Sequence, residues 1–353
     1  MAPIVEKENL SALLVKKDDL QIVNLDIPKP KSSQVLLRMG PVGICGSDVH
    51  YLKHMQIGSF IVKEPMILGH ESAGTVLEVG SEVKTLKVGD RVAIEPGVPC
   101  GRCSFCVGGN YNLCPDVEFL ATPPYHGSLR QYHCHEAAFC FKLPENVSLE
   151  EGALLEPLSV GVHANRKAEV TFGDLVLVCG AGPIGLVNVM VAKAAGASLV
   201  VCTDIDDKRL DFALNCGSDK VLNVRGLSEI TAAEKIIELL QNRRPNRVIE
   251  CSGAQSSARA AIHAIAAGGK MALVGLAPSD DLTLPMITAS CKEVSITGVF
   301  RYANCYPTAL NLVASGKVDV KKLVTHRFDL KDSIKAFATT FNGEGVKVVI
   351  NCS

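Results

Sequence analysis

The feature that most constrains the fold is a glycine-rich turn, Gly180-Ala-Gly-Pro-Ile-Gly185, between an apolar run at 174–179 and a helical pattern that continues to 195. An unbroken apolar run is typical of a strand buried on both faces of a parallel sheet. The first glycine allows a tight turn, the second lets the backbone approach a pyrophosphate, and the third lets the helix pack on the strand. This context predicts a dinucleotide-binding fold with phosphates at the helix N-terminus. The residues of this turn that are expected to bind the cofactor are Gly180, Gly182, Pro183, Ile184 and Gly185.

An acidic residue, Asp204, ends the next apolar run and indicates which dinucleotide is bound. A carboxylate here accepts hydrogen bonds from the adenosine ribose hydroxyls and repels a 2′-phosphate. The next residue is Ile205, which offers that phosphate no positive charge, although Lys208 and Arg209 follow. We therefore predict NAD rather than NADP. The alternatives are a turn residue at Asp204 and, for Arg209, a solvated helix charge in place of an adenine contact.

Apolar runs and helical patterns alternate from 159 to 299, which predicts six parallel strands with helices between them. Because ligands bind at the carboxyl ends of such strands, three strand-end segments are expected near the cofactor. They are Ser252 and Gly253, then Val274, Gly275 and Leu276, and finally Val299, Phe300 and Arg301. Residues 1–158 read instead as short strands and turns, and a strand near 350 must pack back on them. The predicted fold class is α/β: a discontinuous β-rich catalytic domain (1–158 and 300–353) plus a Rossmann domain with a doubly wound parallel sheet (159–299).

A short polar segment in the β-rich part, Gly69-His70-Glu71, offers two metal ligands side by side. With Cys45 in an upstream glycine-rich loop, it supplies sulfur, nitrogen and oxygen donors, which suit a borderline-soft cation such as Zn²⁺. Three protein ligands leave a fourth position for water or substrate, as in catalytic zinc sites. Neighbouring side chains on a strand point to opposite faces, so the pair needs a bend that a flanking glycine can supply.

Four closely spaced cysteines, Cys100, Cys103, Cys106 and Cys114, predict a second zinc site. Two-residue gaps let neighbouring thiolates converge on one tetrahedral ion, and four sulfurs complete its shell. A closed shell has no room for substrate, so this zinc is expected to brace a surface lobe and to do no chemistry. The alternative is a loop of free thiols.

The composition excludes several functional classes. The 36 basic and 37 acidic side chains nearly balance, which argues against a nucleic-acid binder. The N-terminus lacks the apolar core of a signal peptide, and glycines, a proline and polar residues interrupt the apolar stretch 175–202. Cysteines outside the two metal sites are most simply small buried hydrophobes. We therefore predict a cytoplasmic protein with neither membrane nor nucleic-acid partners.

These motifs together resemble the zinc-containing medium-chain alcohol dehydrogenases. Gly69-His70-Glu71-x2-Gly74-x5-Gly80-x2-Val83 matches that family's zinc signature at each fixed position. Within the family, the chain is most similar to the sorbitol (L-iditol, polyol) dehydrogenases, over essentially its whole length. The segments that carry this similarity include 43–51, 121–124, 154–161, 299–302 and 323–326.

The resemblance implies a GroES-like fold for the catalytic domain, a homotetramer, and roles for individual residues. Cys45, His70 and Glu71 would be the catalytic zinc ligands, with Glu156 reaching the fourth position directly or through water. The implied polyol-binding residues are Tyr51, Phe119, Glu156, Arg301 and Tyr302. Animal sorbitol dehydrogenases often lack the structural cysteines, whereas this chain keeps all four. The segment 125–127 is acidic in similar proteins but not in this chain, which leaves the preferred polyol open.

The predicted reaction interconverts a polyol such as sorbitol and its ketose, fructose, with NAD⁺ and NADH. Zinc lowers the pKa of the bound alcohol, and the alkoxide gives its hydride to nicotinamide C4. Because Cys45 and Glu71 already neutralise Zn²⁺, Glu156 is expected to act mainly through water. Its alternative is a surface charge. Ser47 is expected to relay the proton towards solvent by way of the ribose and His50, whose alternative is a capping or core role. Arg301 would hold sugar hydroxyls, with a structural salt bridge as its alternative.

Two other functions are weighed against this prediction. A dehydrogenase for xylitol or another sugar alcohol fits the same residues, because sorbitol, xylitol and iditol share the C2 configuration that is oxidised. A non-catalytic, nucleotide-binding structural protein belongs to a different class. Such a protein would be expected to lose Cys45, His70 or Glu71, and the chain has all three.

Overall fold

The chain forms two compact units in a computed structural model that describes residues 8–276 and 281–353. One unit contains the residues up to Glu156 together with Leu323–Ser353, and the other contains Pro157–Lys322. The predicted division differs at its second boundary, since residues 300–322 pack with the second unit. Arg166 in α4 (Leu155–Lys167) holds this segment there, because its guanidinium donates to the Asn304 carbonyl and the Thr308 hydroxyl, each at 2.8 Å.

The first unit is built on a seven-stranded mixed sheet, ordered β12-β8-β7-β3-β20-β19, with β11 also paired to β3. Its strands are β3 (Gln34–Gly43), β7 (Glu71–Val79), β8 (Arg91–Ile94), β11 (Tyr132–Glu136), β12 (Cys140–Lys142), β19 (Val324–Asp329) and β20 (Lys347–Asn351). The central strand β3 pairs with β7 on one side and with β20 on the other, so Gly43 lies opposite both Glu71 and Val349. The C-terminal strand therefore packs back on the first section, as predicted.

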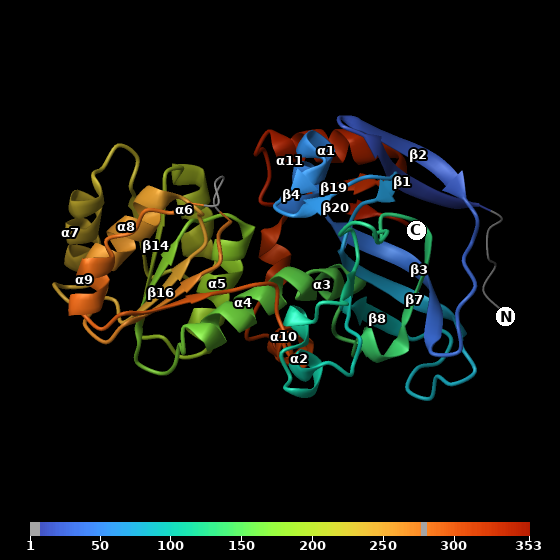
Figure 1. Ribbon diagram of the computed structural model, residues 1–353, viewed down its shortest axis with the longest axis horizontal. Helices are drawn as coiled ribbons and strands as arrows, with labels where there is room; N and C mark the ends of the chain where they lie inside the picture. Colours follow the sequence, from blue (N-terminus) through green and yellow to red (C-terminus); the bar gives the residue numbers. More distant parts are fainter. Residues whose placement is uncertain (1–7, 277–280) are drawn as a thin grey trace. The chain divides into compact units, whose positions relative to one another are not determined.

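Smaller elements surround this sheet. A three-stranded sheet contains β1 (Asn9–Lys16), β2 (Asp19–Leu25) and β6 (Met66–Ile67), and two short pairs are β4 (Gln56–Ile57) with β5 (Phe60–Ile61) and β9 (Gly97–Val98) with β10 (Glu118–Phe119). The helices are α1 (Gly46–His54), α2 (Ser104–Val107), α3 (Leu149–Ala153) and α11 (Ser333–Phe341), with 3₁₀ turns η1 (Tyr111–Leu113), η2 (Ala137–Phe139) and η4 (Leu330–Asp332). A further 3₁₀ turn, η3 (Val320–Leu323), spans the boundary at which the chain returns from the second unit. Figure 1 shows α1 and α11 beside β1 and β2.

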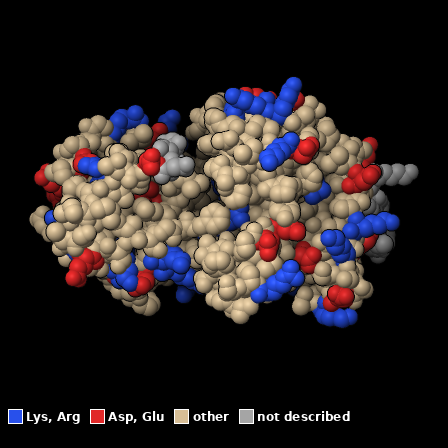
Figure 2. Space-filling model, in the orientation of Figure 1, with Lys and Arg blue, Asp and Glu red and all other residues tan. Residues whose placement is uncertain are grey.

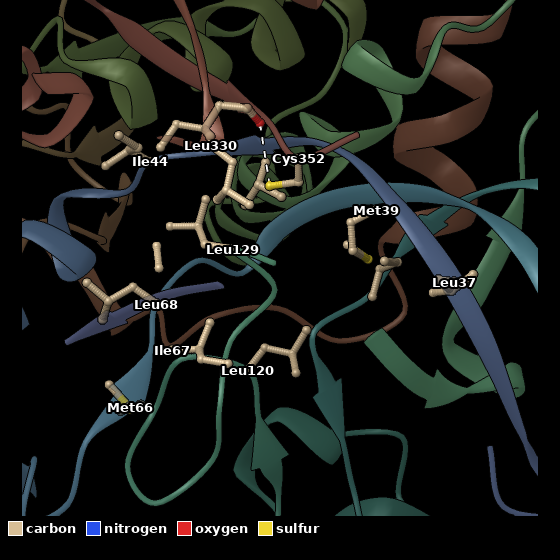
Figure 3. Packing of buried hydrophobic residues seen from close by; sticks show 14 of the residues in the cluster. Leu37, Met39, Ile44, Met66, Ile67, Leu68, Leu120, Leu129, Leu330 and Cys352 are labelled. Atoms are coloured by element: carbon tan, nitrogen blue, oxygen red, sulfur yellow. Dashed lines mark hydrogen bonds between the residues drawn. The ribbon is translucent and has the colours of Figure 1, made fainter. Parts of the chain in front are cut away.

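The core of the first unit is one cluster of apolar side chains from the strands and the loops between them. Leu37, Ile67, Leu68 and Leu129 are completely buried in it, and Ile350 joins them from β20. Figure 3 shows Ile67, Leu68 and Leu129 directed into a shared interior. Burying these side chains supplies the main favourable free energy for ordering short strands that have little intrinsic preference of their own.

The second unit contains a six-stranded sheet, ordered β15-β14-β13-β16-β17-β18, in which all neighbours run parallel. Its strands are β13 (Leu175–Cys179), β14 (Leu199–Asp204), β15 (Lys220–Asn223), β16 (Arg247–Glu250), β17 (Lys270–Leu273) and β18 (Ser295–Gly298). Its helices include α5 (Pro183–Ala194), α6 (Asp207–Asn215), α7 (Glu229–Leu239), α8 (Gln255–Ala264), α9 (Met286–Cys291) and α10 (Tyr306–Ala314). Figure 1 shows α5 and α7–α9 on opposite sides of β14 and β16. The predicted doubly wound parallel sheet is confirmed.

The surface mixes charges of both signs. In Figure 2, basic and acidic side chains are scattered among uncharged ones over the face in view. Within the described ranges, none of the helices combines the length and the apolar character needed to span a bilayer.

Candidate active site

Three predicted ligands converge in the first unit because β3 and β7 pair there. Glu71 is the first residue of β7 and lies opposite Gly43 at the end of β3, while Cys45 follows two residues later as the N-cap of α1. His70 precedes β7, and the bend expected at Gly69 is present, with φ of +88°. The ligand atoms of Cys45, His70 and Glu71 all lie within 4.8 Å of one another.

Asp48, which the sequence reasoning missed, connects two of these ligands. Its carboxylate is completely buried and accepts hydrogen bonds from the Cys45 amide at 3.0 Å and the Gly69 amide at 2.9 Å. His70 Nδ1 lies 3.5 Å from Asp48 Oδ1. Burial alone would raise the pKa of Asp48, but the His70 imidazole and the two amides hold it below its usual value. Its signal in the sequence was the capping-box spacing, an acid three residues after the N-cap Cys45.

Lys347 in β20 is a second residue that the sequence reasoning missed. Its Nζ donates to both oxygens of Glu71, at 2.6 and 2.7 Å, and to the Ile44 carbonyl at 3.2 Å. The two side chains are 3% and 1% exposed. Burial alone would lower the pKa of Lys347, yet Glu71 and Cys45 raise it, so the ammonium stays charged. Asp48 and Lys347 carry opposite charges, so together they leave the net charge of the site unchanged. Cys45 and Glu71 therefore still balance the charge of Zn²⁺, and Glu156 is still expected to act mainly through water.

The donor set fits a zinc ion. It combines one sulfur, one nitrogen and one oxygen donor, as in open catalytic zinc sites. His70 Nδ1 is buried and makes no hydrogen bond to any other described residue, and such an atom is expected to have a partner. A Cβ atom added to Gly43 would collide with Glu71 Oε2, so a glycine is required beside this carboxylate. Cys45, His70 and Glu71 would hold the ion.

Three other residues predicted for this centre, Glu156, Phe119 and Tyr51, are all buried. Glu156 is 5% exposed at the start of α4 and contributes to the pKa values of Glu95 and Lys347, so it is no surface charge. The Phe119 ring centre lies 5.9 Å from that of His70, and Tyr51 is buried in α1.

The two residues predicted to relay a proton both belong to α1. Ser47 is half-buried, and His50 is exposed, where its ring centre lies 4.7 Å from that of His54. An exposed ring is inconsistent with the core role weighed for His50. Arg301 and Tyr302 belong to the second unit, where Arg301 stacks on Phe300 at 4.9 Å and Tyr302 is buried.

The four cysteines of the second predicted zinc site also converge. Their sulfur atoms lie within 4.8 Å of one another, with 3.4 Å between Cys103 and Cys106 and 3.9 Å between Cys100 and Cys106. Tetrahedral zinc with Zn–S bonds of about 2.3 Å requires a sulfur separation of about 3.8 Å. The Arg102 and Cys103 amides lower the pKa of Cys100 to about 6, while desolvation and the Cys103 thiol raise the pKa of Cys106 to about 12. The lobe therefore suits a zinc ion.

The glycine-rich turn of the second unit has the geometry expected of a dinucleotide site. Gly180 has φ of +94°, and a Cβ on Gly185 would collide with the Gly180 carbonyl. Nothing lies within 4 Å of a Cβ built on Gly182, the N-cap of α5, so space is open where a pyrophosphate would approach. Pro183 and Ile184 open α5 as predicted.

Asp204 ends β14, beside this turn. Its Oδ2 accepts from the Ala181 amide at 2.7 Å, and its Oδ1 accepts from Ile205 at 2.7 Å and Asp206 at 3.0 Å. These bonds fix the carboxylate at the carboxyl end of the sheet. Arg209 follows in the first turn of α6, where its amide is capped by Asp206.

Two of the three predicted strand-end segments follow β17 and β18. The amides of Val274 and Gly275 donate to the Glu250 carbonyl at 2.8 and 2.9 Å. Leu276 is 78% exposed. The Val299 amide donates to the Leu273 carbonyl, and Phe300 is 43% exposed. Arg301 has φ of +52°.

Comparisons with known proteins agree with this arrangement. Residues 31–145 match the model of the alcohol dehydrogenase GroES-like domain, and residues 183–315 match that of the zinc-binding dehydrogenases. The chain is 52% identical over 352 residues to a sorbitol dehydrogenase of Macaca fascicularis, covering 100% of this chain and 98% of the relative.

Solved structures share the fold. An Escherichia coli alcohol dehydrogenase crystallised with NADH superimposes with a TM-score of 0.91 at 28% identity, covering 98% of this chain and 100% of that one. The L-idonate 5-dehydrogenase of Escherichia coli gives 0.89 at 28% identity, covering 98% of each chain.

The predicted GroES-like and Rossmann domains, and the predicted cofactors Zn²⁺ and NAD, are thereby confirmed. With identity of about one half over its full length, the chain belongs to the zinc-containing medium-chain dehydrogenase family, close to its sorbitol dehydrogenases.

Proposed function

We propose that the chain oxidises a polyol such as sorbitol at C2 to its ketose, with NAD⁺ as hydride acceptor, and catalyses the reverse reaction with NADH. The observation that carries this proposal is the convergent Cys45–His70–Glu71 donor set, in a chain about half identical to sorbitol dehydrogenases along its whole length. The same three ligands argue against the non-catalytic, nucleotide-binding alternative, because such a protein would have no use for an open metal site.

The chain's own residues supply positioning and proton transfer. Zinc, when bound, lowers the pKa of an alcohol and polarises a ketone. Asp48 accepts from the Cys45 and Gly69 amides, and Lys347 holds Glu71, so that the three ligands are preorganised. Glu156, buried in the same unit, is proposed to orient the substrate hydroxyl directly or through water. Ser47 is proposed to pass the proton outward, and His50, exposed on the same helix, to deliver it to solvent.

Further residues are proposed to recognise the polyol and NAD. Tyr51 and Phe119 are proposed for the substrate in the first unit, supported by burial of both side chains. Arg301 and Tyr302 are proposed for hydroxyl binding on the basis of the sequence resemblance. In the second unit, Asp204 is proposed to select NAD through the ribose, supported by its fixed position at the end of β14.

The test is an NADH absorbance assay of the zinc-loaded protein over a panel of sorbitol, xylitol and iditol, with and without a chelator. Chelator-sensitive NADH formation with at least one polyol is expected, and the ranking of rates selects among the substrates. A protein that binds NADH and retains zinc but oxidises no member of the panel would contradict the proposal and favour the non-catalytic class.

We also propose a cytoplasmic homotetramer. None of the fourteen cysteines forms a disulfide, which agrees with a reducing compartment. Two separate surfaces are suited to contacts between copies: the edge strand β18, and the exposed Phe105, Val107 and Leu113 of the four-cysteine lobe. Two such surfaces are what a tetramer with dihedral symmetry requires. Light scattering of the purified protein and cell fractionation test these two points.

A further inference from the structure

The lobe that carries the four cysteines is joined at its base to the catalytic centre. The lobe lies between β9 and β10, which pair through Val98 with Glu118 and Gly97 with Phe119. Phe119 contacts the His70 ring, with 5.9 Å between ring centres. A Cβ on Gly97 would lie only 3.0 Å from Phe119 Cδ2, so the aromatic ring is packed tightly between the lobe and the histidine.

A second connection runs through Tyr111, three residues before the last cysteine of the lobe. The Tyr111 hydroxyl donates to Glu95 Oε1 at 2.6 Å. The Tyr111 ring also packs edge-on against Phe139, with 6.2 Å between centres. Since Glu95 is only 2% exposed, this hydrogen bond is made in the interior, where losing it is costly.

Glu95 lies beside the catalytic carboxylates. It directly follows β8, whose last residue, Ile94, pairs with Ser72, the neighbour of Glu71 in β7. The antiparallel register therefore places Glu95 opposite the start of β7. Burial raises the pKa of Glu95 to about 7, the Tyr111 hydrogen bond opposes this rise, and the nearby Glu156 adds to it. The Glu95 backbone is fixed as well, by a bond to the Phe139 carbonyl at 2.9 Å.

We propose that Tyr111 is a positioning residue for catalysis, which holds Glu95 in place beside Glu71 and Glu156. The four-cysteine lobe then does more than brace a surface loop, because it sets the geometry of the catalytic centre through Tyr111 and Phe119. This inference rests on the proposed function, in which Glu71 binds zinc and Glu156 orients the substrate. Without the Tyr111 hydroxyl, Glu95 has to find another hydrogen-bond donor, and the neighbouring carboxylates shift in response.

The test compares Tyr111→Phe with Asn110→Ala, a matched change that removes a different lobe hydrogen bond, from Asn110 Nδ2 to the Gly108 carbonyl. The protein carries Co²⁺ at the catalytic centre and zinc in the lobe, so the visible absorption of cobalt reports the geometry around Cys45, His70 and Glu71. Tyr111→Phe is expected to shift the cobalt bands and to lower kcat about 10-fold, as loss of an outer partner of a metal site does. NADH affinity stays unchanged. Asn110→Ala leaves both spectrum and kcat as in the parent protein.

A second variant keeps the inference testable if Tyr111→Phe folds poorly. Glu95→Leu removes the carboxylate that Tyr111 holds, so it is expected to shift the cobalt bands and to lower kcat as Tyr111→Phe does. An unaltered cobalt spectrum in either Tyr111→Phe or Glu95→Leu overturns the inference. Failure of the proposed function is seen separately, as a parent protein without polyol oxidation, and the cobalt spectrum still reports the effect of Tyr111 in that case.

Discussion

The two metal-binding clusters of the first unit differ in how the chain builds them. The four-cysteine lobe takes all its ligands from residues 100–114, and three of the four cysteines are only half-buried. The catalytic centre takes Cys45 and His70 from two loops and Glu71 from the start of β7. His70 and Glu71 are buried, Cys45 is half-buried, and Glu71 pairs with Lys347 from the last strand. A local cluster with four thiolates gains its order mainly from the ion itself. The open centre is preorganised by the fold, which leaves one metal position free for chemistry.

The largest expected effect is a loss of activity, and it distinguishes the catalytic centre from the four-cysteine lobe. Cys45→Ser is expected to abolish polyol oxidation, because the open site loses its thiolate ligand and with it the zinc that activates the alcohol. The fold of the protein and its NADH affinity are expected to survive, as measured by circular dichroism and fluorescence titration. Cys103→Ser, the matched change in the lobe, should lower thermal stability while leaving measurable activity. An inactive but fully stable Cys103→Ser protein would contradict this comparison.

Glu156→Gln tests whether the catalytic centre really stays open. If Glu156 acts on the substrate, turnover falls by about 100-fold, as for loss of an acid–base group, while NADH affinity and zinc content are retained. Zinc analysis after dialysis, together with steady-state kinetics, checks this. Loss of zinc from Glu156→Gln would mean that Glu156 is a direct fourth ligand, and unchanged turnover would remove its catalytic role.

Lys347→Met tests the preorganisation of the centre. The substitution leaves Glu71 as a buried carboxylate without its partner, and breaking such a pair costs about 3–5 kcal/mol. Urea unfolding of the metal-free protein should show this loss, and added zinc should recover part of it. The double variant Lys347→Met with Glu71→Gln serves as the control, because neither charge remains. If the double variant is as unstable as the single one, lost packing rather than the ion pair is responsible.

The smallest expected effect is a loss of folding stability at acidic pH. His135 is buried and contacts the Glu95 carbonyl through Nε2 at 2.8 Å, and burial lowers its pKa to about 4. The folded state therefore binds this proton more weakly than the unfolded state, whose histidine pKa is about 6.5. Its contribution is fully present above about pH 6.5 and is lost at about 1.4 kcal/mol per pH unit as the pH falls towards 4. Urea unfolding at pH 7 and 5 measures this slope, which His135→Gln should flatten and His50→Gln should not.

Features that depend on short spacing could be predicted from the sequence. The cysteine spacing, the Gly69–Glu71 segment and the glycine-rich turn before Asp204 are each local, and each required backbone conformation follows from the residues themselves. The whole-chain resemblance then supplied Glu156, which is buried as a role at the catalytic centre requires.

The residues that were missed share a dependence on long-range pairing. Lys347 meets Glu71 only because β3 lies between β7 and β20, and a lysine inside an apolar strand carries no sign of its partner. Asp48 was visible as an acid in a helix cap, but its contact with Gly69 depends on the fold of the loop before β7. The second domain boundary was likewise placed too early, because the Arg166 contacts that hold residues 304–308 join distant parts of the sequence.

The origin of Lys347 in β20 also bears on the order in which a newly made chain acquires its two metal sites. Residues 100–114 are synthesised early and can bind zinc as soon as they leave the ribosome. The catalytic centre lacks its lysine until all of Pro157–Lys322 has been made, since Lys347 follows that unit in the sequence. Domains generally fold as units during synthesis, so the Rossmann unit is expected to be folded before the catalytic centre is complete. The catalytic centre is therefore the last of the two metal sites to be completed, after the Rossmann unit has been made.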